Sequence, residues 1–373
     1  MRLDLWDGSA PMSVGIIGAG VISDRYLSNA KRFPGLKMVA IADIDPARSR
    51  ARAAQHDVAA LSVADLLADP AIEVVVNLTV PSVHAEVNRA AILAGKHVYS
   101  EKPLATDRTA GAELLALADQ RGLLVGCAPD TFLGAGLQTA RSVLDAGVIG
   151  TPIAATAFMV GFGPERWHPD PAFFYAPGAG PLFDVGPYYL TMLVHLFGPI
   201  AAVNAHAVIG RATRPIFSEP RRGQLIKVTT PTHVSAQIEF VDGPAATLIT
   251  SFDVPASELP RGEVYGSEGT LSLPDPNTFG GPVRVKRLDE ADWTSTPLDR
   301  PFAEESRGLG LADMVASIRG GGGRTDGNRA SGRLALHVLD AMQAILESAE
   351  SRSWRNLTTS CSRPSPLPAE VLA

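Results

Sequence analysis

The sequence predicts a two-domain protein, in which an α/β domain with a parallel sheet precedes an α+β domain with a large open, mainly antiparallel sheet. Strand-length apolar runs alternate with helix-length segments from residue 14 to about residue 128. After about residue 150 the strand patterns follow one another directly. A chain of 373 residues is also long for one hydrophobic core. We therefore expect domains at residues 12–128 and 129–360.

The first domain should contain five strands, because five runs are short, apolar and nearly free of polar alternation. These runs are 14–18, 38–43, 74–80, 97–100 and 123–128. The helices expected between them are 21–33, 47–55, 82–94 and 106–120. Alternation of strand and helix favours right-handed crossovers and therefore a parallel sheet with helices on both faces.

The second domain should be built on a meandering sheet, with Asp242-Gly243 as a hairpin turn. Its expected strands are 153–160, 202–209, 234–241, 246–254, 263–265, 270–273 and 283–287. Its expected helices are 134–146, 184–197, 311–318 and 329–348. We expect a flexible connector at residues 320–323, and poor order in the leader before residue 12 and in the tail 361–373.

Composition narrows the function classes. A hydrophobic fraction of 46% and a charged fraction of 19% are typical of a packed globular protein. The net charge of −6 gives no general attraction to nucleic acid or to an anionic membrane surface. No apolar run is long enough to cross a bilayer and the N-terminus lacks a signal core, so we expect a cytoplasmic protein. Cys127 and Cys361 form neither a disulfide framework nor a zinc site, and we expect no bound metal.

A glycine turn joins the first strand to the first helix. Gly18 and Gly20 allow a tight turn and the close approach of a pyrophosphate. The helix start at Val21 and Ile22 then offers free N–H groups and the positive end of the helix dipole. Ser23 stands where the usual motif has its last glycine. The strand–turn–helix context predicts a dinucleotide site in a Rossmann-type domain.

Asp43 ends the second strand, at the distance where an acid usually binds the adenine ribose. A carboxylate there would repel a 2′-phosphate, so the sequence favours NAD over NADP. Arg48 and Arg50 are close enough to soften this preference, although positions on a solvated helix face explain them better. Asp43 could instead only cap the next turn.

Several motifs, taken in order, resemble the Gfo/Idh/MocA oxidoreductase family over essentially the whole chain. The motifs are the Gly18–Ser23 turn, Asp43, Thr79–Pro81 followed by His84, Glu101-Lys102-Pro103, Ala146–Gly150 and Gly178–Gly186. Each motif is weak alone, whereas the ordered combination is specific.

The resemblance implies how the cofactor is held. It places Thr79–Pro81 and Glu101 against the ribose and nicotinamide half, and Lys102 between nicotinamide and substrate. The bond before Pro103 is often cis in such proteins, which would aim Lys102 into the cleft. His84 could contact the cofactor or simply begin a helix.

The catalytic prediction rests on Lys102, Asp184 and Tyr188. Asp184 and Tyr188 lie four residues apart on one predicted helix face. The family usually has Asp-x-x-x-His here, so Tyr188 is a departure. Tyrosine titrates near ~10 unless a cation stabilises the phenolate, and Lys102 is the expected cation. We expect Tyr189 to be a core residue and His195 to be structural.

Four residues are candidates for substrate contact. Trp167 and His168 lie in a loop-rich stretch, where an aromatic ring and an imidazole could stack on and hydrogen-bond a sugar, or simply pack the loop. Asp130 and Thr131 follow the fifth strand, at the edge where open α/β sheets bind ligands. The family often has an arginine near this place; its absence here makes an acidic substrate less favoured.

The resemblance implies hydride transfer between NAD and a hydroxyl or keto group of a sugar, inositol or glycoside. Two alternatives stay open: a glycoside-cleaving enzyme that oxidises transiently and eliminates, and a non-catalytic sensor of dinucleotide or sugar. An open sheet with exposed apolar positions also predicts a homodimer or homotetramer formed through the C-terminal sheet.

Overall fold

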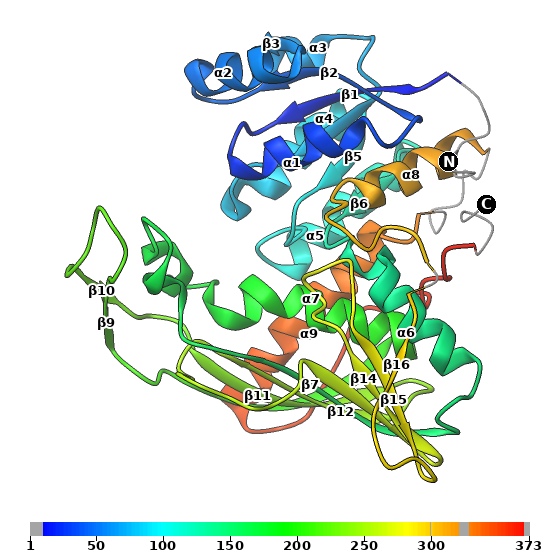
Figure 1. The fold of residues 1–373 in the computed structure, drawn as a ribbon. Helices are drawn as coiled ribbons and strands as arrows, with labels where there is room; N and C mark the ends of the chain where they lie inside the picture. Colours follow the sequence, from blue (N-terminus) through cyan, green and yellow to red (C-terminus); the bar gives the residue numbers. More distant parts are fainter. Residues whose placement is uncertain (1–9, 299, 321–327, 369–373) are drawn as a thin grey trace. The chain divides into compact units, whose positions relative to one another are not determined.

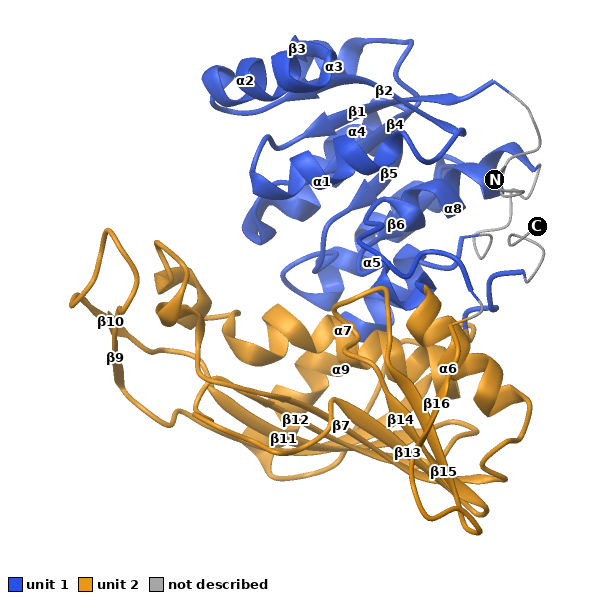
Figure 2. Ribbon diagram, viewed as in Figure 1, with its two compact units in different colours: residues 1–134, 300–339, 364–373 blue, residues 135–299, 340–363 orange. Residues whose placement is uncertain are grey.

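The computed structural model describes residues 10–298, 300–320 and 328–368. The described chain forms two compact units, which Figure 2 colours separately. Unit 1 comprises residues 1–134, 300–339 and 364–373, and unit 2 comprises residues 135–299 and 340–363. The chain therefore returns to unit 1 at residues 300–339 and again at 364–373, whereas the predicted domains are two continuous segments. The domain limits 12–128 and 129–360 stay a prediction.

Unit 1 is built on six parallel strands in the order β3-β2-β1-β4-β5-β6 (Figure 1). The strands are β1 Met12–Ile17, β2 Leu36–Ala42, β3 Ala59–Leu61, β4 Val74–Asn77, β5 His97–Ser100 and β6 Val125–Cys127. The parallel sheet confirms the predicted fold class. The strand order reverses between β1 and β4, which is where ligands bind in such sheets.

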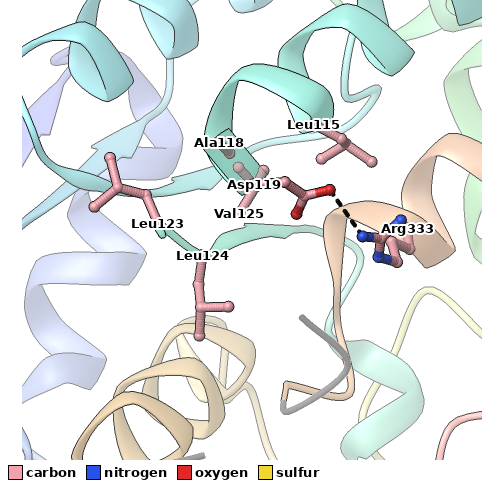
Figure 3. A pocket seen from close by; sticks show the side chains of 7 residues that line it. All are labelled: Leu115, Ala118, Asp119, Leu123, Leu124, Val125 and Arg333. Carbon is pink, nitrogen blue, oxygen red and sulfur yellow. Dashed lines mark hydrogen bonds and ion pairs between the residues drawn. The ribbon is translucent and has the colours of Figure 1, made fainter. Parts of the chain in front are cut away.

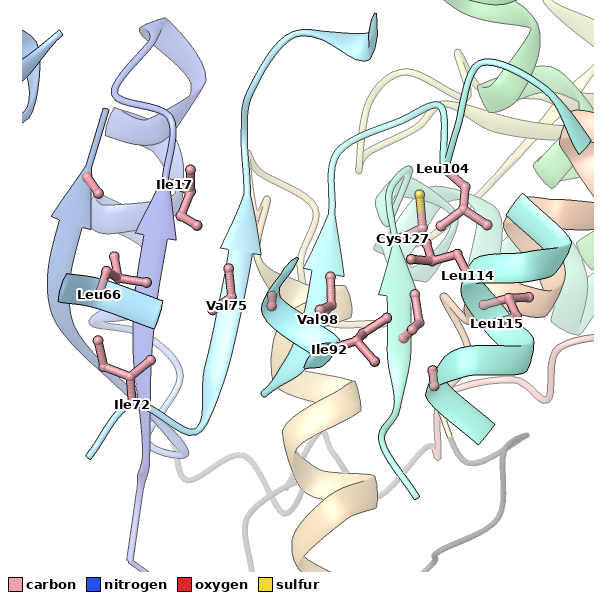
Figure 4. Packing of buried hydrophobic residues seen from close by; sticks show 14 of the residues in the cluster. Ile17, Leu66, Ile72, Val75, Ile92, Val98, Leu104, Leu114, Leu115 and Cys127 are labelled. Carbon is pink, nitrogen blue, oxygen red and sulfur yellow. The ribbon is translucent and has the colours of Figure 1, made fainter. Parts of the chain in front are cut away.

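Helices link these strands and bury the sheet. They are α1 Val21–Ala30, α2 Pro46–His56, α3 Val63–Ala68, α4 His84–Leu93 and α5 Arg108–Gln120, with a short 3₁₀ turn η1 at Pro81–Val83. Figure 4 shows Ile17, Val75 and Val98 of three neighbouring strands in one packed cluster with Leu114 and Leu115 of α5. This continuous core fixes the strand ends, and hence the loops that follow them.

Unit 2 contains a nine-stranded sheet in the order β16-β15-β14-β13-β7-β12-β11-β8-β17. Its strands are β7 Pro152–Val160, β8 Ile200–Val208, β11 His233–Phe240, β12 Ala245–Ser251, β13 Gly262–Gly266, β14 Gly269–Leu273, β15 Val283–Arg287, β16 Thr294–Thr296 and β17 Arg355–Asn356. All neighbours are antiparallel except β7 and β12. The expectation of a mainly antiparallel sheet is confirmed, and β11 and β12 pair as the Asp242-Gly243 turn predicts.

A separate hairpin and several helices complete the chain. The hairpin joins β9 Thr213–Pro215 to β10 Leu225–Lys227. The helices are α6 Ala135–Asp145, α7 Gly180–Phe197, α8 Leu309–Arg319 and α9 Gly332–Ser351, and the 3₁₀ turns are η2 Thr131–Leu133, η3 Pro164–Arg166 and η4 Ala172–Tyr175. Within unit 2, α6 packs on β14 and β15, and α7 packs on β7, β11 and β12.

Some of the observed elements differ from the predicted ones. The strand β3 and helix α3 were not predicted, because β3 is three residues long and α3 only six. The helix α7 begins four residues before Asp184, at Gly180. It also tolerates Pro187 inside, although proline removes one backbone hydrogen bond.

Some expectations fall at the margins of the described chain. The expected leader lies mainly within residues 1–9, the expected connector mainly within 321–327 and the end of the expected tail within 369–373, all outside the described residues. In the parts that are described, every helix is too short or too polar to cross a bilayer.

Candidate functional site

The turn between β1 and α1 requires glycine at its first position. Gly18 has φ = 108°, and a Cβ atom on it would lie 2.6 Å from the carbonyl carbon and oxygen of Leu78. Gly20 precedes the helix with an extended backbone and no side-chain cap, and a Cβ there would meet nothing within 4 Å. The backbone at Gly20 is therefore open on its Cβ side, and no side chain caps the helix that begins at Val21, as the close approach of an anion would require.

The Asp43 carboxylate is half-buried and ties two turns together. Its Oδ2 accepts a hydrogen bond from the Ala19 N–H at 2.7 Å, and its Oδ1 accepts one from the Asp45 N–H at 2.9 Å. Asp43 thus braces the glycine turn. Each oxygen keeps a second lone pair, so ribose hydroxyl groups could still be accepted.

Exposed apolar side chains gather along the same edge of the sheet. Ile44 follows β2, Val21 follows β1 and Val80 follows β4, and these three strands are neighbours. The exposed fractions of these side chains are 97%, 90% and 62%, in that order. An apolar rim around an open helix start fits a ligand with flat rings and a charged centre. Val80 lies within the Thr79–Pro81 loop that the sequence places at the cofactor. Sequence reasoning missed Ile44, for which the apolar character directly after Asp43 was the available signal.

The Thr79 loop is held from beneath by buried amides. Thr79 donates both its hydroxyl (2.6 Å) and its backbone N–H (3.1 Å) to Asn77 Oδ1. Asn77 in turn donates to Asn88 Oδ1 of α4 at 2.7 Å. Pro81 begins the η1 turn that leads into α4. The Thr79 loop is therefore held in place by hydrogen bonds within unit 1.

His84 is a buried link between two loops. Its Nδ1 lies 2.7 Å from the Pro103 carbonyl oxygen and its Nε2 lies 3.0 Å from the Thr79 carbonyl oxygen. Both contacts are hydrogen bonds only when both ring nitrogens carry a proton. The imidazole is 1% exposed, so this structure ties the loops together through His84 rather than presenting its ring to a ligand.

The Glu101–Pro103 segment follows β5 and carries a cis peptide bond before Pro103. Glu101 Oε1 accepts the Tyr26 hydroxyl at 3.0 Å, and Glu101 Oε2 accepts the Lys102 N–H at 3.1 Å. Burial and the Glu101 carboxylate raise the pKa of Tyr26 well above its ordinary value, so its hydroxyl stays a donor. Sequence reasoning missed Tyr26, because no motif connects α1 to a residue 75 positions later.

Asp130 and Thr131 are both buried. Asp130 Oδ2 accepts the N–H groups of Gly308 (2.9 Å) and Gly310 (3.1 Å) at the start of α8. Burial raises the pKa of Asp130 to about 6. In this structure the carboxylate caps the start of a helix.

In unit 2, Asp184 and Tyr188 lie on the early part of α7. Together with Val185, they are the residues between 181 and 197 that are not fully buried. They share one helix face, as the spacing of four residues predicts. Tyr189 is 2% exposed and His195 is fully buried, in agreement with a core and a structural position.

The Trp167–His168 loop carries an exposed aromatic ring. Trp167 is 66% exposed and lies edge-on to His168, with ring centroids 5.4 Å apart. His168 Nδ1 accepts the Asp170 N–H at 3.0 Å, which leaves Nε2 as the other polar atom of the ring. Both side chains lie in unit 2, as do Asp184 and Tyr188.

A small pocket on unit 1 is separate from these residues. Figure 3 shows its lining, with Leu123 and Leu124 beside the ion pair of Asp119 and Arg333. It lies where β6 begins, whereas the glycine turn and Glu101 follow the ends of parallel strands. Among the described residues, no group of three or more His, Cys, Asp or Glu side chains could hold a metal ion.

Comparison with known proteins gives consistent matches. Residues 12–128 match the model of the oxidoreductase family with an NAD-binding Rossmann fold, and residues 137–272 match the GFO/IDH/MocA C-terminal domain. A dTDP-3,4-didehydro-2,6-dideoxy-alpha-D-glucose 3-reductase of Streptomyces antibioticus is 28% identical over 92% of this chain and 99% of its own. An inositol 2-dehydrogenase of Ralstonia nicotianae is 28% identical over 71% of this chain and 74% of its own.

Solved structures share the fold. An NAD-binding oxidoreductase from Klebsiella pneumoniae superimposes with a TM-score of 0.79 at 24% identity, covering 94% of this chain and 100% of its own. A levoglucosan dehydrogenase in complex with NADH and L-sorbose gives 0.78 at 20% identity, with the same coverage. With both family models matched over most of the chain, and with the glycine turn and Glu101-Lys102-Pro103 in place, this protein belongs to the Gfo/Idh/MocA family of oxidoreductases.

Proposed function

We propose that this oxidoreductase transfers a hydride between NAD and a hydroxyl or keto group of a sugar, inositol or glycoside. The observation that carries the proposal is the edge of the unit 1 sheet. There the helix α1, which no side chain caps, follows β1. Asp43, which accepts the Ala19 N–H, follows the neighbouring strand β2, and the Glu101–Lys102 segment follows β5 of the same sheet. The names of the relatives, a sugar reductase and an inositol dehydrogenase, support the substrate class.

NAD is proposed over NADP because Asp43 would accept ribose hydroxyls and repel a 2′-phosphate. Gly18, Gly20, Val21 and Ile22 would hold the pyrophosphate. Thr79, Pro81 and Glu101 would contact the ribose and nicotinamide half, and His84 would act through the loops it joins. When bound, the nicotinamide supplies the hydride acceptor or donor.

Proton transfer is assigned to Lys102 and Tyr188. Hydride removal from an alcohol requires a group that takes the hydroxyl proton, and the reverse reaction requires one that returns it. A phenolate serves as base when a cation lowers its free energy, and the Lys102 ammonium is proposed for that role. Asp184 would orient the substrate or the lysine.

Substrate contact is proposed mainly for the Trp167–His168 loop. An indole packs against the apolar C–H face of a sugar ring, and an imidazole can bond its hydroxyl groups. Asp130 and Thr131 are weaker candidates, because both are buried and Asp130 already accepts two backbone N–H groups.

The experiment is a screen for NADH formation with sugars, inositols and methyl glycosides, each with NAD and with NADP. We expect a higher kcat/KM with NAD. At saturating NAD, Lys102→Ala and Tyr188→Phe should each lower kcat by roughly 100-fold, the usual scale for losing an acid–base group. The matched control is Tyr189→Phe, which changes the buried neighbour of Tyr188 and should be nearly silent.

The other outcomes have distinct meanings. A clear advantage for NADP would contradict the role of Asp43. Full activity in Tyr188→Phe with none in Lys102→Ala would make the lysine the sole proton-transferring group. Glycoside cleavage with trapped cofactor and no net NADH would support the elimination mechanism in place of a dehydrogenase. Dinucleotide binding without any turnover would support a sensor.

We further propose a homodimer or homotetramer formed through the unit 2 sheet. The sheet face opposite α6 and α7 carries half-buried small and apolar side chains, such as Phe158 and Ile249. Covering such a face with a second copy removes apolar surface from water, which favours assembly.

A further inference from the structure

Unit 2 buries an arginine that the proposed chemistry does not use. Arg214 of β9 is 1% exposed and is the largest fully buried side chain among the described residues. Its Nε donates to Glu165 Oε1 at 2.7 Å, one terminal nitrogen donates to the Phe252 carbonyl at 2.7 Å, and the other contacts Asp253 Oδ1. The guanidinium also lies 5.0 Å from the centroid of the Phe162 ring.

Glu165 connects this arginine to the loop before α7. The carboxylate is fully buried; its Oε2 accepts the Tyr175 hydroxyl and its backbone carbonyl accepts the Phe217 N–H at 2.9 Å. Burial and the bond to Glu165 raise the pKa of Tyr175, so the phenol stays protonated and donates. A Cβ atom on Gly163 would lie 1.9 Å from the Tyr175 hydroxyl, so only glycine fits beside this bond.

Asp253 closes the network on the other side. Its Oδ2 accepts the Thr232 hydroxyl at 2.5 Å, and Thr232 accepts the Gly210 N–H at 3.0 Å. One guanidinium therefore joins the loop 161–176, the β9 strand and the segments that flank β11 and β12. Guanidinium geometry suits this task, because its N–H groups form a rigid planar fork.

The loop held in this way carries Trp167 and His168. Their backbone N–H groups donate to the Pro164 carbonyl at 3.1 and 2.8 Å, one residue before Glu165. The His168 carbonyl accepts the Ser218 hydroxyl from the β9–β10 hairpin. The base of the loop is thus fixed by buried charge, whereas the Trp167 ring at its surface is 66% exposed.

Stability alone is a poor explanation for such a network. Replacing a buried ion pair by packed apolar groups is often neutral or stabilising, because two charges must lose their hydration. A buried pair can instead favour one backbone conformation over the alternatives. This matters most for a loop such as 161–176, whose regular structure is limited to two short 3₁₀ turns.

We propose that the Arg214–Glu165–Tyr175 network is a positioning device that presents Trp167 as the stacking wall for a sugar ring. Arg214, Glu165 and Tyr175 touch no ligand themselves and act through Trp167. This inference rests on the proposed sugar-directed function for the identity of the ligand, while the positioning of the loop is independent of it.

The test is a double-mutant cycle with Tyr175→Phe and Trp167→Ala. Tyr175→Phe keeps the ring and removes only the hydroxyl donated to Glu165. Each single variant should raise KM for the sugar by about 10-fold and change kcat little, the scale of one lost contact in a binding site. The double variant should again show about 10-fold rather than about 100-fold, because both changes remove the same contact.

A matched control is Tyr265→Phe, which removes another hydroxyl donated to a carboxylate of unit 2, that of Glu263. It should leave KM unchanged. Multiplying effects in the double variant, or an equal rise of KM in the control, would overturn the positioning role. The positioning role would also be overturned if Tyr175→Phe lowered thermal stability but left KM for the sugar unchanged.

Amide hydrogen exchange separates this proposal from the proposed function. Tyr175→Phe should speed exchange at the N–H groups of Trp167, His168 and Phe217, and leave β11 and β12 unchanged, whether or not a sugar is turned over. Faster exchange without turnover on any sugar would refute the proposed function and the sugar wall while leaving the loop-positioning role. Unchanged exchange in the loop would overturn the positioning role itself.

Discussion

Two buried side chains hold the Glu101–Pro103 segment without facing open space. Tyr26 of α1 donates to Glu101, and His84 of α4 contacts the Pro103 carbonyl. The helix that offers its N-terminus at Gly20 is therefore bonded directly to the carboxylate proposed for the nicotinamide ribose. At the residue scale, a change at Tyr26 should therefore alter the affinity for the cofactor.

Tyr26→Phe tests this link. The ring remains between Tyr99 and the α8 start, but Glu101 Oε1 loses its buried donor. A hydrogen bond to a charged group contributes about 1.5–3 kcal/mol, so we expect affinity for NADH to fall roughly 10- to 100-fold. Calorimetric titration of the folded variant with NADH measures this directly.

Tyr99→Phe is the matched control for Tyr26→Phe. Its ring lies 6.4 Å from that of Tyr26, and its buried hydroxyl has no hydrogen-bond partner among the described residues. Removing that hydroxyl should leave NADH affinity unchanged. Equal loss of affinity in both variants would show that core packing, and not the bond to Glu101, is responsible.

Local motifs predicted part of the candidate site. The Gly18–Gly20 turn and Asp43 were identifiable because the strand, turn and helix that give them meaning lie within 30 residues. Tyr26 and Arg214 were not, because their partners Glu101 and Asp253 lie 75 and 39 residues away. No periodicity or spacing in the sequence records such pairs.

At the scale of elements, α8 is capped by a residue far from it in sequence. The residue before α8 is Gly308, which has φ = 101° and no side chain to cap the helix. Asp130 Oδ2 accepts two N–H groups there instead. A carboxylate is favoured at a helix N-terminus, yet burial raises the pKa of Asp130 to about 6, above its ordinary 3.8.

Asp130→Asn should change how stability depends on pH. Because the folded-state pKa is raised, the contribution of Asp130 is fully present below about pH 4 and is lost as pH rises through 6. Asparagine keeps an oxygen for both N–H groups and has no charge to lose. From pH 4 to 7 the free energy of unfolding of the variant should therefore rise by about 2–3 kcal/mol relative to the unmodified protein.

Denaturant unfolding at pH 4, 5, 6 and 7 measures this difference. A constant offset that arises from the new amide group does not affect the comparison, because only the change with pH counts. Parallel pH profiles would contradict the ionisation of Asp130 in this range. A rise in KM for the sugar together with parallel profiles would return Asp130 to the substrate site.

Element prediction succeeded where an apolar run stood out from its surroundings and failed for several strands of three residues. The strands β1, β5 and β11 were predicted within two residues of their bounds. The hairpin of β9 and β10 has three-residue strands, and Arg214 at its centre is a charged residue that sequence patterns assign to the surface. Only the carboxylates supplied by other segments make its burial possible.

At the scale of the whole molecule, the unit 2 sheet has two unlike faces. Leu248, Ala157 and Ala236 are buried on the face that α7 covers. Their alternates Ile249, Phe158 and Ser235 are half-buried on the opposite face, where Ile249 pairs with both others across the strands. A broad face of small and apolar groups suits packing of one sheet against another copy.

Light scattering during gel filtration should therefore give a dimer or tetramer mass at micromolar concentration, with a Tm that rises with concentration. Ile249→Lys should lower the mass, because a buried ammonium at the centre of the interface would lose its hydration without a partner. The control is Ile153→Lys on β7. The Ile153 side chain is 62% exposed and points to the opposite face of the sheet from Ile249, so this change should leave the mass unchanged.

A monomer mass for the unmodified protein at every concentration would refute assembly altogether. An oligomer unaffected by Ile249→Lys would place the interface on another surface, and an equal loss in both variants would point to a general effect of added charge.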